Sequence, residues 1–77
     1  MKELLTYIAQ SLVDNPDEVT VIENENDEGG NVTLTLSVAP DDMGLVIGRH
    51  GRIAKAIRTV LKSAGNKENV KVSLEIL

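Results

Sequence analysis

Apolar side chains recur at helical spacing near the start of the chain and alternate with polar ones further along. Within residues 2–13 they stand three and four positions apart, at Leu4, Leu5, Ile8, Ala9, Leu12 and Val13. This spacing predicts an amphipathic helix that ends before Asn15-Pro16. Residues 18–26 are rich in β-branched side chains and predict a strand, and "DEGGN" at residues 27–31 predicts a hairpin turn.

Two further segments alternate between apolar and polar side chains, which is the pattern of a strand with one buried face. The first is residues 31–39, whose apolar positions are Val32, Leu34, Leu36 and Val38. The second is residues 70–77, in which we expect the buried side chains to be Val70, Val72, Leu74 and Ile76. The sequence therefore predicts three strands.

Two helices are predicted between the second and third strands. Pro40 ends the second strand, Asp41 is a suitable N-cap, and Asp42 suits the positive end of the helix dipole. This first helix has room for about six residues before Gly48. A longer helix restarts near Gly51, and its apolar stripe at 3.6-residue spacing is Ile53, Ile57, Val60, Leu61 and Ala64.

The longer helix carries basic side chains on the side opposite that stripe, at Arg52, Lys55, Arg58 and Lys62. Gly65-Asn66 is its predicted C-terminal end. The resulting order, α-β-β-α-α-β, predicts one α+β domain over residues 1–77, a two-layer sandwich with a three-stranded mixed sheet. Because the last strand follows a helical crossover, we expect it to pair in parallel with the second strand, through a right-handed connection.

Charge is distributed unevenly along the chain. The 77 residues carry a net charge of −4 and contain no cysteine, so there is no disulfide framework and no thiolate metal site. Residues 1–42 hold one lysine and ten carboxylates, a net charge of −9, whereas residues 43–77 have a net charge of +5. Such asymmetry indicates an anionic partner on one side of the molecule. The alternative is accidental segregation of solvated surface charges.

The basic half opens with "DDMGLVIGRHGRIAKAIR" at residues 41–58. Its two glycines are three positions apart, follow Val46-Ile47, lie between two predicted helices and are bracketed by strands. With this segment, and over essentially its whole length, the sequence resembles a KH domain of the type II topology. It is most similar to the KhpA (YlqC) family of small bacterial single-KH RNA-binding proteins. Leu45 departs from that family, in which its position is often basic, and Ala54 replaces the larger aliphatic residue common in KH domains.

The resemblance implies that the glycine loop clamps single-stranded RNA, since KH domains hold about four nucleotides there. Glycines let the backbone turn sharply and let a ligand strand approach closely. The amides that start the following helix suit a phosphate group. The candidate RNA-binding residues are the loop and its flanks: Gly48, Arg49, His50, Gly51, Arg52, Lys55, Val46 and Ile47.

Bases are expected in the groove between the two helices and the adjacent strand. Val46 is the better candidate for its apolar floor, whereas core packing explains Ile47 and Ile53 at least as well. Lys62 lies about 20 Å from Arg49 along the helix and is interpreted as a solvated charge.

The family resemblance also implies partners and a setting. It implies an RNA chaperone-like factor of low sequence specificity that acts in the cytoplasm and in cell-shape regulation. It further implies a homodimer, a complex with a second KH protein of the KhpB (Jag/EloR) type, or both, because linking two weak sites raises affinity. We expect no cofactor, no small-molecule substrate and no membrane association, since no signal peptide or run of 18 apolar residues is present.

Other functions stay open on the residues alone. A protein-interaction or dimerisation module with little RNA binding of its own is favoured by the acidic first half and by Leu45. A DNA-binding helix-turn-helix shares the helix–GRHG–helix outline, but its first helix would be too short and its turn too loose. An enzyme is not expected: one histidine and no cysteine supply no nucleophile–base set, and the loop lacks the GK[ST] ending of a P-loop.

Overall fold

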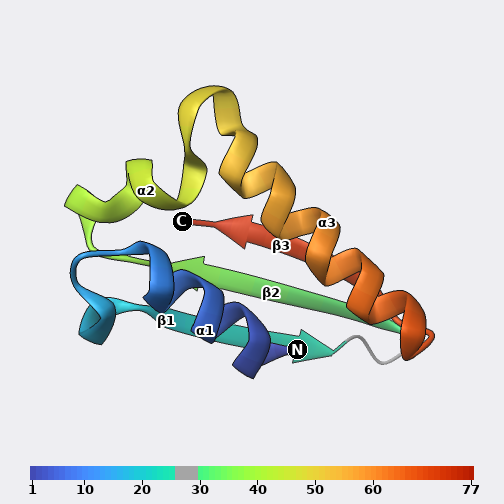
Figure 1. Cartoon of the computed structure of the whole chain (residues 1–77). Helices are drawn as coiled ribbons and strands as arrows, with labels where there is room; N and C mark the ends of the chain where they lie inside the picture. The colour runs from blue at the N-terminus through green and yellow to red at the C-terminus, as the bar shows by residue number, and fades with distance from the viewer. Residues whose placement is uncertain (26–29) are drawn as a thin grey trace.

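The computed structural model describes residues 1–25 and 30–77. Its helices and strands are α1 (Lys2–Leu12), β1 (Thr20–Glu25), β2 (Asn31–Ser37), α2 (Met43–Ile47), α3 (Arg52–Lys67) and β3 (Lys71–Ile76). Short 3₁₀ turns occupy Pro16–Glu18, Pro40–Asp42 and Arg49–Gly51. The predicted order α-β-β-α-α-β is confirmed, and Figure 1 shows α1 and α3 lying across the sheet.

The sheet has the order β1-β2-β3, with β1 antiparallel to β2 and β2 parallel to β3, as predicted. Its helix-facing side carries the buried apolar residues of β2, whereas Thr33, Thr35 and Ser37 lie on the other side and are half-buried. Residues 27–29 of the predicted hairpin turn lie outside the described residues. Gly30, at its end, has a φ of +76°, which agrees with a turn that needs glycine.

The core takes its most buried side chains from α1, β2, α2 and α3. Among the described residues, the large apolar side chains that are at most 1% exposed are Leu5 of α1, Leu34 and Leu36 of β2, Val46 of α2 and Leu61 of α3. Burying each such side chain contributes about 1.5–3 kcal/mol. In β3 only Val72 is fully buried, while Val70, Leu74 and Ile76 are partly covered because β3 is an edge strand. The expectation that all four would be buried is therefore only partly met.

The buried face of α3 differs from the predicted stripe. Its buried residues are Ala54, Ile57, Leu61 and Gly65, whereas Val60 is 46% exposed and Ile53 is only partly covered. At Gly65 this face packs against β3, where a Cβ would stand 2.7 Å from Cγ2 of Val72. A larger side chain there would hold the helix further from β3, so close packing favours glycine at this position.

The predicted end of α3 at Gly65-Asn66 is wrong, because the helix continues to Lys67. Gly65 is instead a contact point, since a Cβ there would stand 2.7 Å from both the carbonyl oxygen of Val70 and Cγ2 of Val72. The helix ends with Asn69 at φ +60°. The Val70 amide donates to the Gly65 carbonyl at 2.9 Å and the Asn69 amide donates to the Asn66 carbonyl at 3.3 Å. This is a Schellman ending with asparagine in the left-handed position.

Candidate nucleic-acid interface

The turn between α2 and α3 is made of residues whose backbone favours glycine. Gly48 ends α2 with φ 76° and ψ 175°, a combination essentially restricted to glycine. A Cβ at Gly48 would stand 2.6 Å from Cγ1 of Ile53, so space forbids a side chain as well. Gly51 has φ 73°, and its amide donates to the Gly48 carbonyl at 3.2 Å, which closes the turn. Both glycines are therefore required by the backbone that they form.

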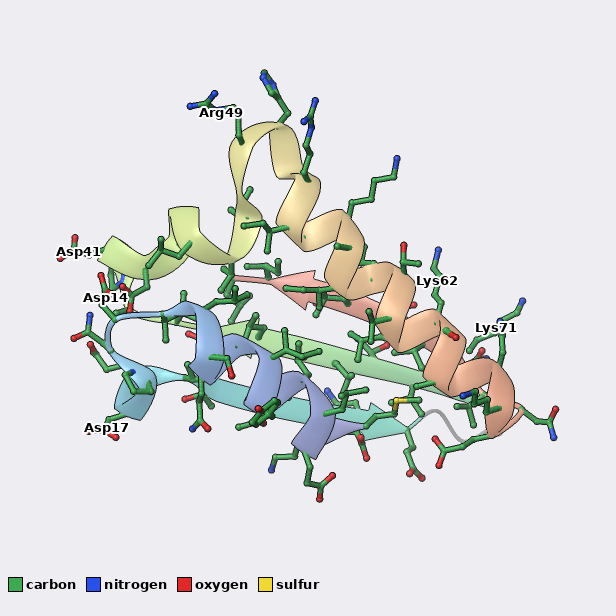
Figure 2. The ribbon with its side chains drawn as sticks, viewed as in Figure 1. Asp14, Asp17, Asp41, Arg49, Lys62 and Lys71 are labelled. Carbon is green, nitrogen blue, oxygen red and sulfur yellow. The ribbon has the colours of Figure 1, made fainter. Side chains whose placement is uncertain are left out.

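Arg49 and His50, between these glycines, are exposed. His50 has φ 58° and ψ 25°, so the chain is left-handed at this residue too. Figure 2 shows Arg49 extending from the tip of the turn, away from the body of the domain. The loop thus presents a fixed cation and an imidazole on a backbone held by the two glycines.

The start of α3 offers backbone donors. Its N-cap position is Gly51, which has no side chain to accept hydrogen bonds from the first amides. The first of these amides, that of Arg52, donates to the Arg49 carbonyl, and the positive end of the helix dipole suits an anion at this end of α3. Arg52 and Lys55, in the first turn, are exposed. Six of the predicted site residues therefore lie at one place: Gly48, Arg49, His50, Gly51, Arg52 and Lys55.

The exposure of the two apolar candidates in α2 is the reverse of the expected one. Val46 is 0% exposed and belongs to the core, so its assignment to the floor of a base-binding groove is wrong. Ile47 is 37% exposed and lies beside the glycine turn, so it is the accessible one of the pair. A five-residue helix has one inward position for each turn, and here that position falls on Val46.

A groove also lies between α3 and β3. It is a hollow of about 240 Å³ lined by Arg58, Leu61, Lys62, Val72, Ser73 and Leu74. Sequence reasoning placed bases against the adjacent strand but named none of its residues. The signal that could have identified them was the alternation of residues 70–77, which fixes one set of β3 side chains toward α3.

A buried carboxylate fixes α2, and with it one side of the turn. Asp42 is 1% exposed, and its Oδ2 accepts hydrogen bonds from the backbone amide and from Nδ2 of Asn15, at 3.0 and 3.1 Å. The prediction of Asp41 as N-cap is wrong: Asp41 is exposed within the Pro40–Asp42 turn, and Asp42 precedes α2 without a side-chain cap. The two aspartates therefore differ in role, and only Asp42 connects α2 to the segment after α1.

A family model described as "KhpA/KhpB, KH domain" matches residues 2–76. The chain belongs to this family. The α-β-β-α-α-β order and the glycine turn between two helices are thus the KH fold as this chain builds it.

Curated members of the KhpA/KhpB family align with the chain from end to end. "RNA-binding protein KhpA" of Clostridium acetobutylicum is 58% identical and that of Clostridium perfringens 57% identical, each over 100% of both chains. The protein of the same name in Listeria monocytogenes is 47% identical over 100% of this chain and 99% of its own. These relatives are named for RNA binding and not for a reaction, in agreement with the expectation of a non-enzymatic protein. No solved structure gives a significant match.

The charges of this KH domain leave its cations unpaired within the described part of the chain. There, no carboxylate lies within 4.0 Å of an arginine or lysine side chain, and the ion pairs are those of the N-terminal ammonium with Glu3 and Glu23. Figure 2 places Asp14, Asp17 and Asp41 together at one end and Lys62 and Lys71 at the other.

Residues 1–25 and 30–77 include no helix long and apolar enough to cross a membrane.

Proposed function

We propose that this protein binds single-stranded RNA by clamping its backbone at the Gly48–Gly51 turn, with low sequence specificity. The observation that carries the proposal is the turn itself. Two glycines with positive φ turn the chain into the start of α3, and Arg49 and His50 stand between them on the surface. Membership of the KH family supports RNA over other anions, because KH domains use this loop to hold about four nucleotides.

The chemistry of the clamp follows from its groups. The amides at the start of α3 donate hydrogen bonds to a phosphate oxygen, and Arg49 adds a charge-assisted bond. Arg52 and Lys55 neutralise the neighbouring phosphates. Bases lie against Ile47 and the groove beside β3. Apolar contact discriminates weakly between bases, so low sequence specificity follows.

One clamp of this size binds weakly, so we also propose that the protein works with a second module, as a homodimer or with a second KH protein of the KhpB type. A further hollow of about 370 Å³, lined by apolar residues apart from Arg52, lies between α1 and α3 and supports a protein partner there: Ile8, Leu12, Arg52, Ile53, Ala56, Ile57 and Val60. Two linked clamps gain effective concentration without new contacts. An RNA chaperone-like role in the cytoplasm, and a part in cell-shape regulation, belong to the same proposal.

The test is fluorescence anisotropy of short single-stranded RNA across a salt series. The Arg49→Asp/His50→Asp variant should lose binding by more than about tenfold, because each lost phosphate contact removes part of the counterion-release term. A control with the same change in net charge is Lys2→Glu/Lys67→Gln, whose side chains are exposed and remote from the turn. Circular dichroism checks that all three proteins are folded.

Equal binding by wild type and the loop variant would contradict the clamp. In that case the turn is structural, and the interaction module with little RNA binding becomes the better account. Its surface would be the apolar side chains that α1, α2 and α3 expose: Leu4, Leu45, Ile47 and Val60.

A further inference from the structure

The sheet has two outer strands, and their free edges differ in charge. Figure 1 shows β1 and β3 on either side of β2, and in the described part of the chain each pairs with β2 alone. In β1 the buried residue, Val21, shares its face with Glu23 and Glu25. Inward-pointing charges of this kind keep an edge strand from pairing with another chain. β3 has no charge on the corresponding face, which carries Val72, Leu74 and Ile76.

The backbone of β3 alternates between groups that bond β2 and groups that point to the free edge. The Leu77 amide donates to the Leu36 carbonyl at 2.9 Å, and the Lys71 amide donates to the Gly30 carbonyl. Successive residues of a strand direct their N–H and C=O groups to opposite sides. The groups that point away from β2 are therefore those of Val72, Leu74 and Ile76. A strand laid along this edge would find donors and acceptors in the right places.

The side chains on the open face of β3 make this edge complementary to itself. They are Lys71, Ser73 and Glu75, and all three are exposed. Among the described residues, no opposite charge lies within 4.0 Å of the side chain of Lys71 or Glu75. When two copies of β3 run antiparallel about a two-fold axis at Ser73, Lys71 of each copy lies directly opposite Glu75 of the other. On the helix-facing side, Val72 of each copy lies opposite Leu74 of the other.

We propose that β3 pairs with β3 of a second copy of this chain, antiparallel and centred on Ser73, so that two three-stranded sheets become one. Each Val72–Leu74 pair exchanges two backbone hydrogen bonds, because both residues direct their polar groups to the edge. The contact is isologous, as two-fold symmetry requires.

Charge selects this register over its neighbour. With the axis at Leu74, Lys71 would lie opposite Leu77, and both ion pairs would be lost. The pairing includes neither the glycine turn nor the hollow between α1 and α3, whose lining contains no residue of β3. The inference therefore goes beyond the proposed function and is tested without RNA.

The experiment reverses the two charges of β3 singly and together. The single variants are Lys71→Glu and Glu75→Lys, and the double variant carries both substitutions. The matched controls are Lys2→Glu and Glu18→Lys, which change the net charge equally at exposed positions outside the sheet. Circular dichroism checks that every protein is folded.

The readout is confined to the edge of β3, so association through another surface does not affect it. NMR follows the hydrogen exchange of the Val72 and Leu74 amides and the change of their shifts with protein concentration. An isotope-filtered NOE between the α-protons of Ser73 in labelled and unlabelled copies reports the register, since these residues form a close, non-hydrogen-bonded pair at the axis.

We expect each single reversal to weaken the pairing about tenfold, because two attractive cross-strand pairs become two repulsive ones. The double variant should pair like wild type, since it only exchanges the two charges. An equimolar mixture of the single variants should pair as well. One copy then has only carboxylates at these two positions and the other has only ammonium groups. Both controls should match wild type.

Three results would overturn the proposal. The first is wild-type protein whose Val72 and Leu74 amides exchange freely and keep their shifts at every concentration. The second is pairing that survives each single reversal, which would place it in another register. The third is a double variant or mixture that does not recover. The clamp is judged separately, because Arg49→Asp/His50→Asp should pair through β3 like wild type whether or not it binds RNA.

Discussion

α3 begins directly after Gly51 and ends at Lys67, two residues past Gly65, and glycine has a different purpose near each end. At the first end, glycine allows the positive φ angles of a turn that presents Arg49 and His50. At the other end, Gly65 has ordinary helical geometry and is buried, because the chain of Val70 and Val72 presses against it. Glycine thus serves the backbone of a turn before α3, the proposed recognition end, and close packing near the other end of the helix, the packing end.

A substitution at Gly65, at the packing end of α3, should reduce the free energy of unfolding more than a substitution in the glycine turn. Gly65→Ala places a Cβ 2.7 Å from a backbone oxygen and from Cγ2 of Val72, so helix and strand must separate. We expect a loss of about 3 kcal/mol in the free energy of unfolding, which lowers Tm by about 15 °C in a domain of this size. Urea unfolding measures it, while RNA binding by the folded protein should be retained.

Gly44→Ala is the matched control for this substitution, because Gly44 is helical and nothing lies within 4 Å of its added Cβ. It should stabilise the protein by about 0.5–1 kcal/mol. If Gly65→Ala behaved like Gly44→Ala, the close approach of α3 and β3 would not limit stability.

Substitutions in the glycine turn, at the recognition end, should change both the stability of the protein and its RNA binding. Gly48→Ala forces alanine into a glycine-only region and against Ile53, which should cost about 2 kcal/mol of stability. It should also weaken RNA binding by the folded protein by more than about tenfold, since the turn must change shape. Gly51→Ala meets open space and requires only the left-handed conformation, so its cost should be about 1 kcal/mol. A larger loss for Gly51→Ala than for Gly48→Ala would reverse this ranking.

The hydrogen bonds that hold α2, and with it one side of the glycine turn, can be removed without changing a residue of the turn. Asp42→Ala leaves the amide and Nδ2 of Asn15 without their acceptor, which should cost about 1–2 kcal/mol in urea unfolding. Asn15→Ala removes only the Nδ2 bond and should cost about half as much. Equal effects would mean that the backbone bond contributes nothing to stability.

The smallest expected effect lies at the packing end. Asn69 has φ +60°, where glycine has no steric cost, so Asn69→Gly should be neutral or stabilising by up to about 0.5 kcal/mol. Asn69→Val, which tolerates this conformation poorly, should cost about 1–2 kcal/mol. Thermal unfolding of the pair measures the difference, and a destabilising glycine would show that the asparagine side chain has a role of its own.

Much of the fold was predictable because its signals are local. Alternation in residues 31–39 and 70–77 identified two strands, and the crossover between them determined parallel pairing. The glycine turn was predictable for the same reason, since two glycines between helices have few structural alternatives. Two of the wrong predictions depend on tertiary contacts that a local pattern does not show. Asp42 bonds to Asn15, 27 residues away, and Gly65 contacts β3 across the end of its own helix.

Short helices are the other source of error. α2 has five residues, too few for a periodic pattern to show which side faces the core. The sequence therefore could not distinguish Val46, which is buried, from Ile47, which is accessible. In α3 the pattern favoured Val60 and Ala64, whereas the buried positions include Ala54 and Gly65, and glycine at Gly65 lets β3 approach closely. Where a helix has apolar residues on more than one face, the buried face is the one whose side chains fit sterically against the neighbouring elements.

The register of the sheet has a consequence for the order of folding. β1 pairs with β2 across a short hairpin, but Asn31 pairs with Lys71, about forty residues further along the chain. Closing the longer loop costs more entropy and is slower, so the hairpin can form well before β3 joins it. α2, the glycine turn and α3 make up that closing loop. The turn that we propose to hold RNA is therefore fixed against the sheet only once the last strand has docked, and a ligand that binds the folded protein alone stabilises it.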